Sequence, residues 1–551
     1  MAGGKSPLNI FKISRGDDPK EVLNWRLWLA VFSFGIMGSA RGVDEGLISG
    51  TLASADFRNL LHLPDVNSSE YASVKATISS MVQIGSVAGA GLAFILCDRI
   101  GRLWATRQLC LVWMLGIVIF MCNNGSLGMV YAGRFIAGLG IGQSSVVAPV
   151  YLAEVSPKAV RGLCTTTFAG SVYIGIMLAY FASWGSSLHM GDHTSARWLV
   201  PTSLHLMFAS IIFTLSWFNY ESPRYLVKIG KDANAKQNLA RIRNLPEDHE
   251  VVRREILEIQ TQLEEERIAT LGQGWLGIVR EMFLIPSNLY RVYLGVAIQL
   301  MVQWCGAQSI TVYAPDFFAS VGVRGQNEKL FATCILGIVK LVGALICAFY
   351  LVDVIGRKRS LTIGISIQVL SMLYITIFLS IVGSPDPATF TSSQKSASTG
   401  AIVMIYLSSF GFALGWNGIQ YLLNAEIYPL RIRAASSSLI MLLHFANQYG
   451  ANRAVPEMQL SPSEGGMGAA GTWWFFCSLT AFSGFWAWFF IPETAGLSLE
   501  AMDRLFTLRW WQIGRRGQSE AAVMHEVHEA YMDEKANEVR REDTPVHVEK
   551  A

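Results

Sequence analysis

The chain has 551 residues, of which 52% are hydrophobic and only 15% are charged, and its formal net charge is +3. Soluble domains carry about 25% charged residues, so this composition excludes a string of soluble domains and indicates a multi-pass membrane protein. The small net charge gives no reason to expect nucleic-acid binding. The eight cysteines lie in or beside apolar segments without CxxC spacing, so we expect small apolar residues and no metal site.

Twelve apolar segments are long enough to cross about 30 Å of hydrocarbon as helices. In chain order they are 27–50, 74–96, 104–122, 129–151, 163–184, 198–218, 291–314, 330–352, 361–382, 400–423, 435–454 and 472–491. The predicted fold is therefore an all-α integral membrane protein with twelve transmembrane helices. The predicted domains are a tail (1–26), a six-helix half (27–218), a polar loop with short helices (219–290), a second six-helix half (291–491) and a tail (492–551).

Basic residues predict the orientation. They cluster in the connections after the second and eighth spans, and a long polar loop follows the sixth span, all on one side. The positive-inside rule makes that side cytoplasmic, together with both termini. The first 26 residues are charged and lack an apolar core, so no cleavable signal peptide is expected. Asn67 begins a glycosylation sequon and falls on the opposite face.

The chain repeats itself weakly. Asp98-Arg99-Ile100-Gly101-Arg102 after the second span is echoed by Asp353-Val354-Ile355-Gly356-Arg357 after the eighth. Glu154 and Arg161 are echoed by Glu426 and Arg433 with the same internal spacing. Two repeated six-helix halves are typical of transporters whose halves rock about a site at mid-membrane.

The motifs DRIGR and DVIGR, Gly133-Arg134 in GRFIAGLGIG, PVYLAEVSPKAVRG, ESPR and PET occur in one order between about residues 25 and 506. In this they resemble the sugar porter family of the major facilitator superfamily. The resemblance implies transport by alternating access, with no enzyme activity and no cofactor. The sequence agrees, since it has no nucleophile–base arrangement, metal-ligand spacing or nucleotide-binding loop.

The resemblance also implies cytoplasmic ion pairs between the halves that close an inner gate. The residues that match those positions are Asp98, Arg102, Glu154, Arg161, Glu221, Arg224, Asp353, Arg357, Glu426 and Arg433. In the loop, apolar residues at helical spacing from Val252 to Leu263 predict an amphipathic helix within 246–270. A partly ordered linker is the alternative.

Charged residues inside a span are functional candidates, because burying them costs several kcal/mol. The resemblance implies that Asp44 of the first span pairs with Arg134 of the fourth span and couples transport to protons. A purely structural pair is the alternative. Glu45 is rotated about 100° from Asp44 and is expected to be a bystander. Arg41 is considered as a second partner of Asp44.

The substrate site departs from the family pattern. Ala169, Val302, Tyr421 and His444 stand where hexose porters keep amides or a tryptophan, and Lys340 adds a cation. A cationic pocket suits a carboxylate, and the surroundings of Lys340 resemble the fungal quinate and galacturonate branch. The alternative is that Lys340 reaches the membrane surface or pairs with an acidic residue. The expected hydroxyl partners are Gln303, Gln308, Asn417 and Asn447.

The sequence therefore predicts a monomeric, proton-coupled importer of a sugar, sugar acid or cyclitol acid in the plasma membrane. Its expected partners are the small-molecule substrate, protons and the lipid bilayer. Three alternatives stay open: a symporter or facilitator for a neutral monosaccharide, a metabolite exporter, and a non-transporting sugar sensor.

Overall fold

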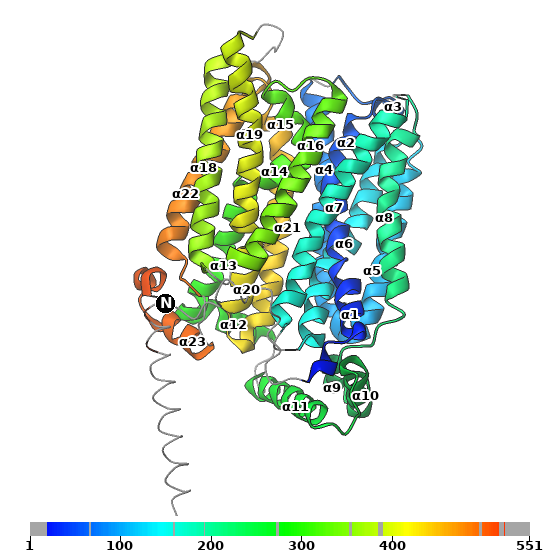
Figure 1. Cartoon of the computed structure of the whole chain (residues 1–551), viewed down its shortest axis with the longest axis vertical. Helices are drawn as coiled ribbons and strands as arrows, with labels where there is room; N and C mark the ends of the chain where they lie inside the picture. Colours follow the sequence, from blue (N-terminus) through cyan, green and yellow to red (C-terminus); the bar gives the residue numbers. More distant parts are fainter. Residues whose placement is uncertain are drawn as a thin grey trace, which may run out of the picture.

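The computed structural model describes residues 19–65, 68–157, 160–191, 193–270, 275–351, 355–383, 390–494, 499–516, 519 and 523. These residues form long helices that stand side by side as a bundle, and no strand occurs within them (Figure 1). One group of helices, α1 to α8, lies on the right of Figure 1 and a second, α13 to α22, on the left. The ends of the bundle are called upper and lower as drawn there.

The first group runs in chain order through seven long or medium helices and the short α3. Its elements are α1 (Trp25–Gly35), α2 (Gly38–Ala53), α3 (Ala55–Leu60), α4 (Ser69–Ile100), α5 (Arg102–Met121), α6 (Leu127–Val155), α7 (Arg161–His189) and α8 (Ala196–Leu215).

The second group contains several broken helices. Its elements are α13 (Pro286–Trp304), α14 (Ala307–Val312), α15 (Ala314–Ser320), α16 (Gln326–Ile346), the π-helix η3 (Cys347–Leu351), α18 (Arg357–Val382), α19 (Ser392–Leu414), α20 (Trp416–Glu426), α21 (Leu430–Met458) and α22 (Gly468–Phe490), with the short 3-10 turn η5 (Pro462–Glu464) before α22.

Short helices cover the lower end of the bundle (Figure 1). They are η2 (Lys20–Val22), α9 (Pro223–Lys228), α10 (Asp232–Arg243), α11 (Glu250–Thr270), α12 (Trp275–Leu284) and α23 (Leu499–Thr507). The predicted amphipathic helix is present as α11, where Val252 and Ile256 are buried against Tyr225 of α9 and Leu239 of α10. That prediction is confirmed, and the linker alternative is wrong.

Eight described helices are long and apolar enough to cross a membrane. They are Ser69–Ile100, Arg102–Met121, Leu127–Val155, Leu163–His189, Ala196–Leu215, Gln326–Ile346, Arg357–Val382 and Ser392–Asn424. The other four predicted spans fall on α1 with α2, on α13 with α14, on α21 and on α22. The chain is thus a multi-pass membrane protein.

The predicted spans are less continuous than the sequence suggested. The first is interrupted after Gly35, the seventh at Cys305 and Gly306, and the tenth at Gly415. Gly306 has a φ of 81°, which a residue with a side chain rarely adopts. Each break frees backbone carbonyls, which need donors inside a membrane. Neutral side chains supply them, as when Gln368 and Thr480 each donate to the Cys305 carbonyl at 3.2 Å.

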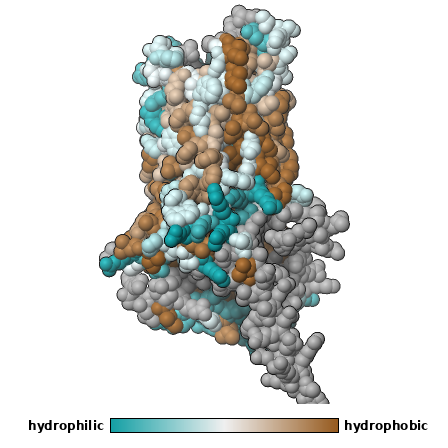
Figure 2. Space-filling model, turned by 90° about the vertical axis from the view of Figure 1, so that its left-hand side faces the viewer, coloured by the Kyte–Doolittle hydropathy of each residue, from teal (hydrophilic) through white to brown (hydrophobic). Residues whose placement is uncertain are grey.

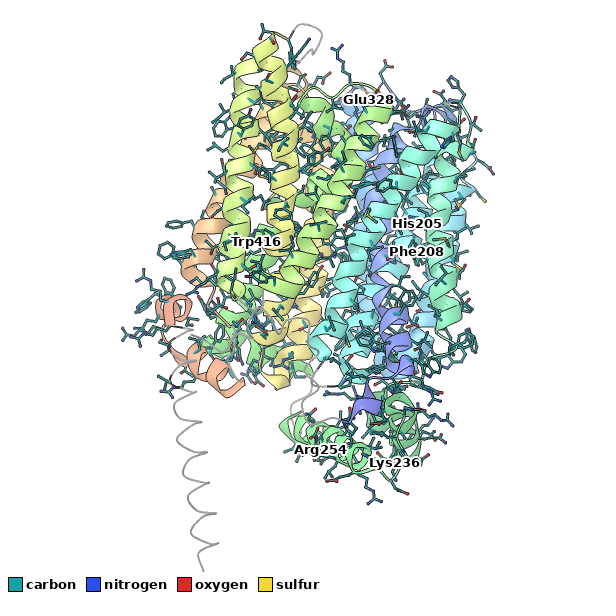
Figure 3. All side chains as sticks on the ribbon, in the orientation of Figure 1. His205, Phe208, Lys236, Arg254, Glu328 and Trp416 are labelled. Carbon is teal, nitrogen blue, oxygen red and sulfur yellow. The ribbon has the colours of Figure 1, made fainter. Side chains whose placement is uncertain are left out.

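The outer surface suits a lipid environment. Figure 2 shows mostly hydrophobic side chains on the upper part of one flank and a hydrophilic patch near its lower part. Large apolar side chains such as Leu370 and Ile381 of α18 and Phe485 of α22 are exposed. Charged side chains such as Lys236 and Arg254 lie at the lower end and Glu328 at the upper end (Figure 3).

A stripe of glycines lets α2 approach α7. A Cβ atom on Gly42 would lie 1.9 Å from the Val172 carbonyl oxygen, and one on Gly46 would lie 2.7 Å from the Ala179 Cβ. Side chains at either position would push the helices apart. The close packing expected of small residues in membrane helices is therefore present here.

We predict that Gly42→Ala destabilises the protein by about 1–3 kcal/mol, the usual cost of overpacking a core. Gly185→Ala on α7 is the matched control, because a Cβ there meets nothing within 4 Å. Thermal unfolding of the purified protein in detergent measures both. Equal melting temperatures for Gly42→Ala and the parent would contradict the packing described.

Candidate functional site

The structure brings Asp44 of α2 and Arg134 of α6 together in the interior of the first group. The Arg134 guanidinium donates to both carboxylate oxygens, at 2.5 Å and 3.4 Å. Its Nε donates to the Ile78 carbonyl of α4 at 3.2 Å. Both side chains are buried. The arrangement holds a carboxylate and its counter-ion at the depth of the apolar helices.

A second buried ion pair lies on α2, on a different face of the helix from Asp44. Arg41 Nε donates to Glu45 Oε1 at 2.7 Å, and Arg41 Nη1 donates to the Tyr421 hydroxyl of α20 at 2.8 Å. Gln448 of α21 accepts from Arg41 Nη2 at 3.4 Å and donates to Glu45 Oε1 at 2.9 Å. This cluster of Arg41, Glu45, Tyr421 and Gln448 joins the two helix groups across their interface.

Two interpretations of α2 from sequence are therefore wrong. Glu45 does face away from Asp44, as the helical rotation predicted, but it is no bystander, because it accepts from Arg41 and Gln448. Arg41 pairs with Glu45 and not with Asp44. The reason is helix geometry: residues four apart lie on one face and their side chains meet.

Lys340 of α16 is buried, with 1% of its surface exposed. Its ammonium donates to the Ala307 carbonyl at 3.2 Å and makes a short contact with the Thr311 hydroxyl, both on α14. It does not reach the membrane surface. Within the described ranges no ion pair to Lys340 is recorded, so neither alternative for this residue holds there. Glu45 is a carboxylate close enough to attract the Lys340 ammonium electrostatically.

His444 of α21 is held by two glutamines of α13. Its Nδ1 lies 2.8 Å from Gln299 Oε1 and 3.1 Å from the Gln303 amide nitrogen, and its Nε2 lies 3.4 Å from the same amide nitrogen. His444 is thus a buried core residue in hydrogen-bonding contact with both glutamines.

The predicted hydroxyl partners separate into two sets. Gln303 and Gln308 line the same region as the Arg41 cluster, and each has a buried amide atom without a hydrogen bond to any described residue, Oε1 of Gln303 and Nε2 of Gln308. Gln308 also lies near Glu45, although no hydrogen bond is recorded between these two described residues. The side-chain amide of Asn447 instead donates to the Leu443 carbonyl of its own helix. The backbone carbonyl of Asn417 accepts from Gln420 of the same helix, a contact that does not involve the Asn417 side chain.

Sequence reasoning missed Gln448, Gln299 and His205. Gln448 is the neighbour of Asn447, which the sequence singled out. The Gln448 side chain contacts Glu45 of the cluster, whereas the Asn447 side chain bonds to its own helix, because adjacent helical residues face different directions. His205 of α8 packs edge-on against Trp113 with ring centroids 5.7 Å apart, and the charge of Arg134 acts on it. A polar residue inside an apolar span was the available signal for all three.

The lower end of the first group is tied together by the first copy of the repeated motif. Arg102 donates to both oxygens of Glu154, at 2.9 Å and 2.7 Å, and to Asp98 at 3.4 Å. Glu221 accepts from the backbone N–H groups of Arg102 and Leu103 and so caps α5. Burial raises the pKa of the Glu221 carboxyl, and the hydrogen bonds from backbone N–H groups oppose that shift.

The second group repeats this arrangement. Arg357 pairs with Glu426 at 3.2 Å, and Glu493 accepts from the backbone N–H groups of Arg357 and Lys358 and caps α18. A Cβ on Gly101 would lie 2.7 Å from Glu221, and one on Gly356 would lie 2.6 Å from Glu493. Glycine is favoured at both places because the backbone has a φ of 89° at Gly101 and 100° at Gly356, which residues with side chains rarely adopt. The weak sequence repeat is therefore a repeat of contacts.

Some of the predicted gate residues lie outside the described part of the chain. Asp353, like the sequon residue Asn67, lies outside the described residues, and so does the side chain of Arg161. Arg224 lies in the first turn of α9, and Arg433 donates to the Tyr428 carbonyl at 2.9 Å. Among the described residues of the predicted gate, the recorded ion pairs join helices of one group and none crosses between the groups.

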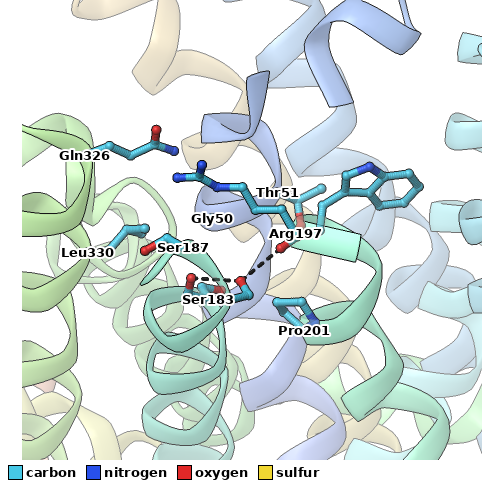
Figure 4. Close-up of a pocket in the computed structure, with 10 residues that line it drawn as sticks. Gly50, Thr51, Ser183, Ser187, Arg197, Pro201, Gln326 and Leu330 are labelled. Atoms are coloured by element: carbon cyan, nitrogen blue, oxygen red, sulfur yellow. Dashed lines mark hydrogen bonds between the residues drawn. The ribbon is translucent and has the colours of Figure 1, made fainter. Parts of the chain in front are cut away.

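Contacts across the two groups are present at the upper end. Lys75 of α4 pairs with Asp316 of α15 at 2.6 Å, and Gln326 of α16 donates to the Ala53 carbonyl at 2.9 Å. Beneath them is a small pocket lined by hydroxyl groups and by Arg197 (Figure 4). Its residue Gly50 is nine positions, or about 14 Å, along α2 from Arg41, so the pocket is separate from the buried cluster.

The family model described as sugar (and other) transporter matches residues 30–506. The chain belongs to this sugar transporter family. A probable quinate permease from Aspergillus niger is 30% identical to this sugar transporter over 515 residues, which cover 93% of this chain and 92% of that protein. A second probable quinate permease, from Neosartorya fischeri, is 29% identical over 521 residues, covering 93% and 94%.

Solved structures show the same fold. The proton:xylose symporter XylE of the major facilitator superfamily, bound to 6-bromo-6-deoxy-D-glucose, matches with a TM-score of 0.71 at 21% identity, over 87% of this chain and 99% of that chain. A partially occluded inward-open structure of XylE from E. coli matches with a TM-score of 0.70 at 19% identity, over 86% and 100%. This sugar transporter therefore has the major facilitator fold.

We predict that Glu493→Gln loosens the first turn of α18, because a charged cap of two backbone N–H groups becomes a neutral one. A cap contributes about 1 kcal/mol, so amide hydrogen exchange at Arg357 and Lys358 should be about fivefold faster. Glu221→Gln should do the same at Arg102 and Leu103. Glu464→Gln, at an exposed position, is the control. Unchanged exchange in both cap variants would contradict the capping role of Glu221 and Glu493.

Proposed function

We propose that this sugar transporter is a proton-coupled importer of a polyhydroxylated carboxylate, a sugar acid or a cyclitol acid. Supporting this, the buried site at the interface of the helix groups has a surplus of positive charge. Arg41 and Lys340 are two cations and Glu45 is the one carboxylate recorded beside them in the described ranges, so these three side chains together carry +1. An anionic substrate would neutralise this positive charge. That is favourable because water cannot solvate a charge in a buried site.

The structural role of Lys340 does not require its charge. Lys340 donates to a carbonyl at a helix break, yet neutral Gln368 and Thr480 do the same for Cys305, and Ser360 does so for Leu414 at 3.0 Å. A neutral donor would be the cheaper solution inside a membrane. Packing therefore does not explain why a charged side chain stands at position 340. Binding of an anionic substrate would explain it.

The hydroxyl groups of the substrate have partners available. Gln303 Oε1 and Gln308 Nε2 are buried without a hydrogen bond to a described residue, and an unpaired buried amide atom costs about 1–3 kcal/mol. A polyol between α13, α14 and the Arg41 cluster would satisfy both. The names of the fungal relatives, probable quinate permeases, agree with a polyhydroxylated acid as substrate.

Proton coupling is assigned to Asp44 and Arg134. Protonation of Asp44 would release Arg134 and permit the loaded protein to change conformation, and deprotonation inside would restore the pair. Each pH unit supplies about 1.4 kcal/mol per proton. The XylE neighbour is described as a proton symporter, which supports the assignment by analogy only.

The topology completes the proposal. All twelve predicted spans cross the plasma membrane, the lower end with α9 to α12 and α23 is cytoplasmic, and a monomer transports. The predicted gate charges then pair across the groups when the lower end closes. A neutral monosaccharide is the second candidate substrate, favoured by Gln303 and Gln308 and by the sugar bound to XylE.

We predict that Lys340→Met weakens uptake of galacturonate or quinate about tenfold to a hundredfold, since losing a hydrogen bond to a charged group costs about 1.5–3 kcal/mol. Radiolabelled uptake in transporter-null cells, compared with glucose and xylose, measures this. Lys329→Met removes the same charge from the outer turn of α16 and is the control. Glucose uptake by the parent that exceeds acid uptake, unaffected by Lys340→Met, would exclude an acid substrate.

We predict that Asp44→Asn abolishes accumulation driven by external acid while equilibration of substrate across the membrane persists. The physical reason is that Asn cannot carry a proton and no longer pairs with Arg134 as an ion. Uptake at two external pH values measures it, with Asp65→Asn in an exposed loop as the control. Acid-driven accumulation that survives in Asp44→Asn would show that another group carries the proton.

A further inference from the structure

Within the described residues, no recorded hydrogen bond joins the Arg41–Glu45 pair to the Asp44–Arg134 pair. Arg134 accounts for both oxygens of Asp44, whereas the hydrogen bonds recorded on Glu45 come from Arg41 and Gln448 and fall on one oxygen, Oε1. A carboxylate and an arginine buried together at the membrane interior are costly to maintain. Their presence beside Lys340 calls for an explanation in terms of the substrate.

The position of the pair places it in reach of a substrate held between the helix groups. Arg41 comes from α2 of the first group, but two of its three acceptors, Tyr421 and Gln448, belong to α20 and α21 of the second group. Gln308 of α14 lies near Glu45, and the same helix supplies both hydrogen-bond acceptors of Lys340, the Ala307 carbonyl and the Thr311 hydroxyl. The two cations and the carboxylate therefore lie around one stretch of the interface.

We propose that Glu45 sets the charge of the substrate by cancelling one of the two cations, so that the site accepts a monoanion. This rests on the proposed function, which assigns an anionic polyol to this site, and adds which charge is preferred and which residue fixes it. With Glu45 ionised, Arg41, Glu45 and Lys340 carry +1, and a single carboxylate brings the loaded site to zero. With a neutral polyol bound, the loaded site keeps one positive charge. With a dianion bound, the loaded site has one negative charge in excess.

The other titratable groups around Glu45 do not alter this count. Asp44 is compensated by Arg134, and the remaining neighbours are two phenols of α7, the phenol of Tyr421 and the His444 imidazole, which lies between the neutral amides of Gln299 and Gln303. The groups concerned are Asp44, Arg134, Tyr173, Tyr180, Tyr421 and His444. Glu45 is then the negative charge that decides between a singly and a doubly charged ligand.

The test uses three six-carbon ligands of galacto configuration: galactose, galacturonate and galactarate, which carry zero, one and two carboxylates. Galactarate is an open chain and the other two form rings, so the readout is the change in relative affinity from one variant to the next. Binding to the purified full-length protein in detergent is measured by calorimetry near neutral pH. The parent should bind galacturonate best. Glu45→Gln keeps the shape of the side chain and an oxygen that accepts from Arg41, but raises the site to +2, and should shift the preference to galactarate by about tenfold.

Two further variants keep the proposal testable if Glu45→Gln does not fold. Arg41→Gln lowers the site to zero and should make galactose the preferred ligand. The double variant Arg41→Gln with Glu45→Gln returns the site to +1 and should restore the preference for galacturonate, which a loss of structure cannot do. Glu328→Gln, an exposed carboxylate on α16, is the matched control and should leave the order of the ligands unchanged.

Each possible result either supports or overturns the proposed role of Glu45. If the parent binds galactose best and neither acid, the proposed function fails and the inference fails with it. If the parent prefers galacturonate but Glu45→Gln and the double variant keep that order without change in ratio, the anionic substrate stands and the role of Glu45 is overturned. A shift to galactarate in Glu45→Gln that is reversed in the double variant supports the assignment.

Discussion

An ionised side chain buried among apolar helices needs a partner, because the membrane interior cannot solvate it. The helix α2 carries three such side chains on two faces. Asp44 is matched by Arg134 of α6, and Arg41 with Glu45 is matched by Tyr421 of α20 and Gln448 of α21. These contacts fix α2 against both helix groups at once. The glycines of α2 permit this, since they let the helix lie directly on the backbone of α7.

The same requirement explains why the candidate site lies where it does. The breaks at Gly306 and Gly415 divide α13 from α14 and α19 from α20, and the freed carbonyls draw in polar side chains from neighbouring helices. Lys340 is one of these side chains, and it brings a charge to a place where an uncharged donor would suffice. Polar groups, broken helices and unmatched charge therefore meet at the interface that must open and close for transport.

Much of this architecture could be predicted from sequence, because apolar length and family motifs are local properties. The Asp44–Arg134 pairing could also be predicted, from the motif around Arg134. The helix breaks could not, since Gly306 and Gly415 look like ordinary small residues until neighbours such as Gln368 satisfy the exposed backbone. Nor could the pairing of Glu45 or the capping role of Glu493, because both depend on which residues of distant segments face them.

We propose that the carboxylate of the substrate binds at the interface of the helix groups, beside the Arg41 cluster and Lys340. A cryo-electron microscopy structure of the full chain with galacturonate or quinate bound tests this binding mode directly. We expect the ligand carboxylate within hydrogen-bonding distance of the Arg41 guanidinium or the Lys340 ammonium, with its hydroxyls on Gln303 and Gln308. A ligand whose carboxylate lies away from both cations, for example beside Arg197 at the upper end, would contradict it.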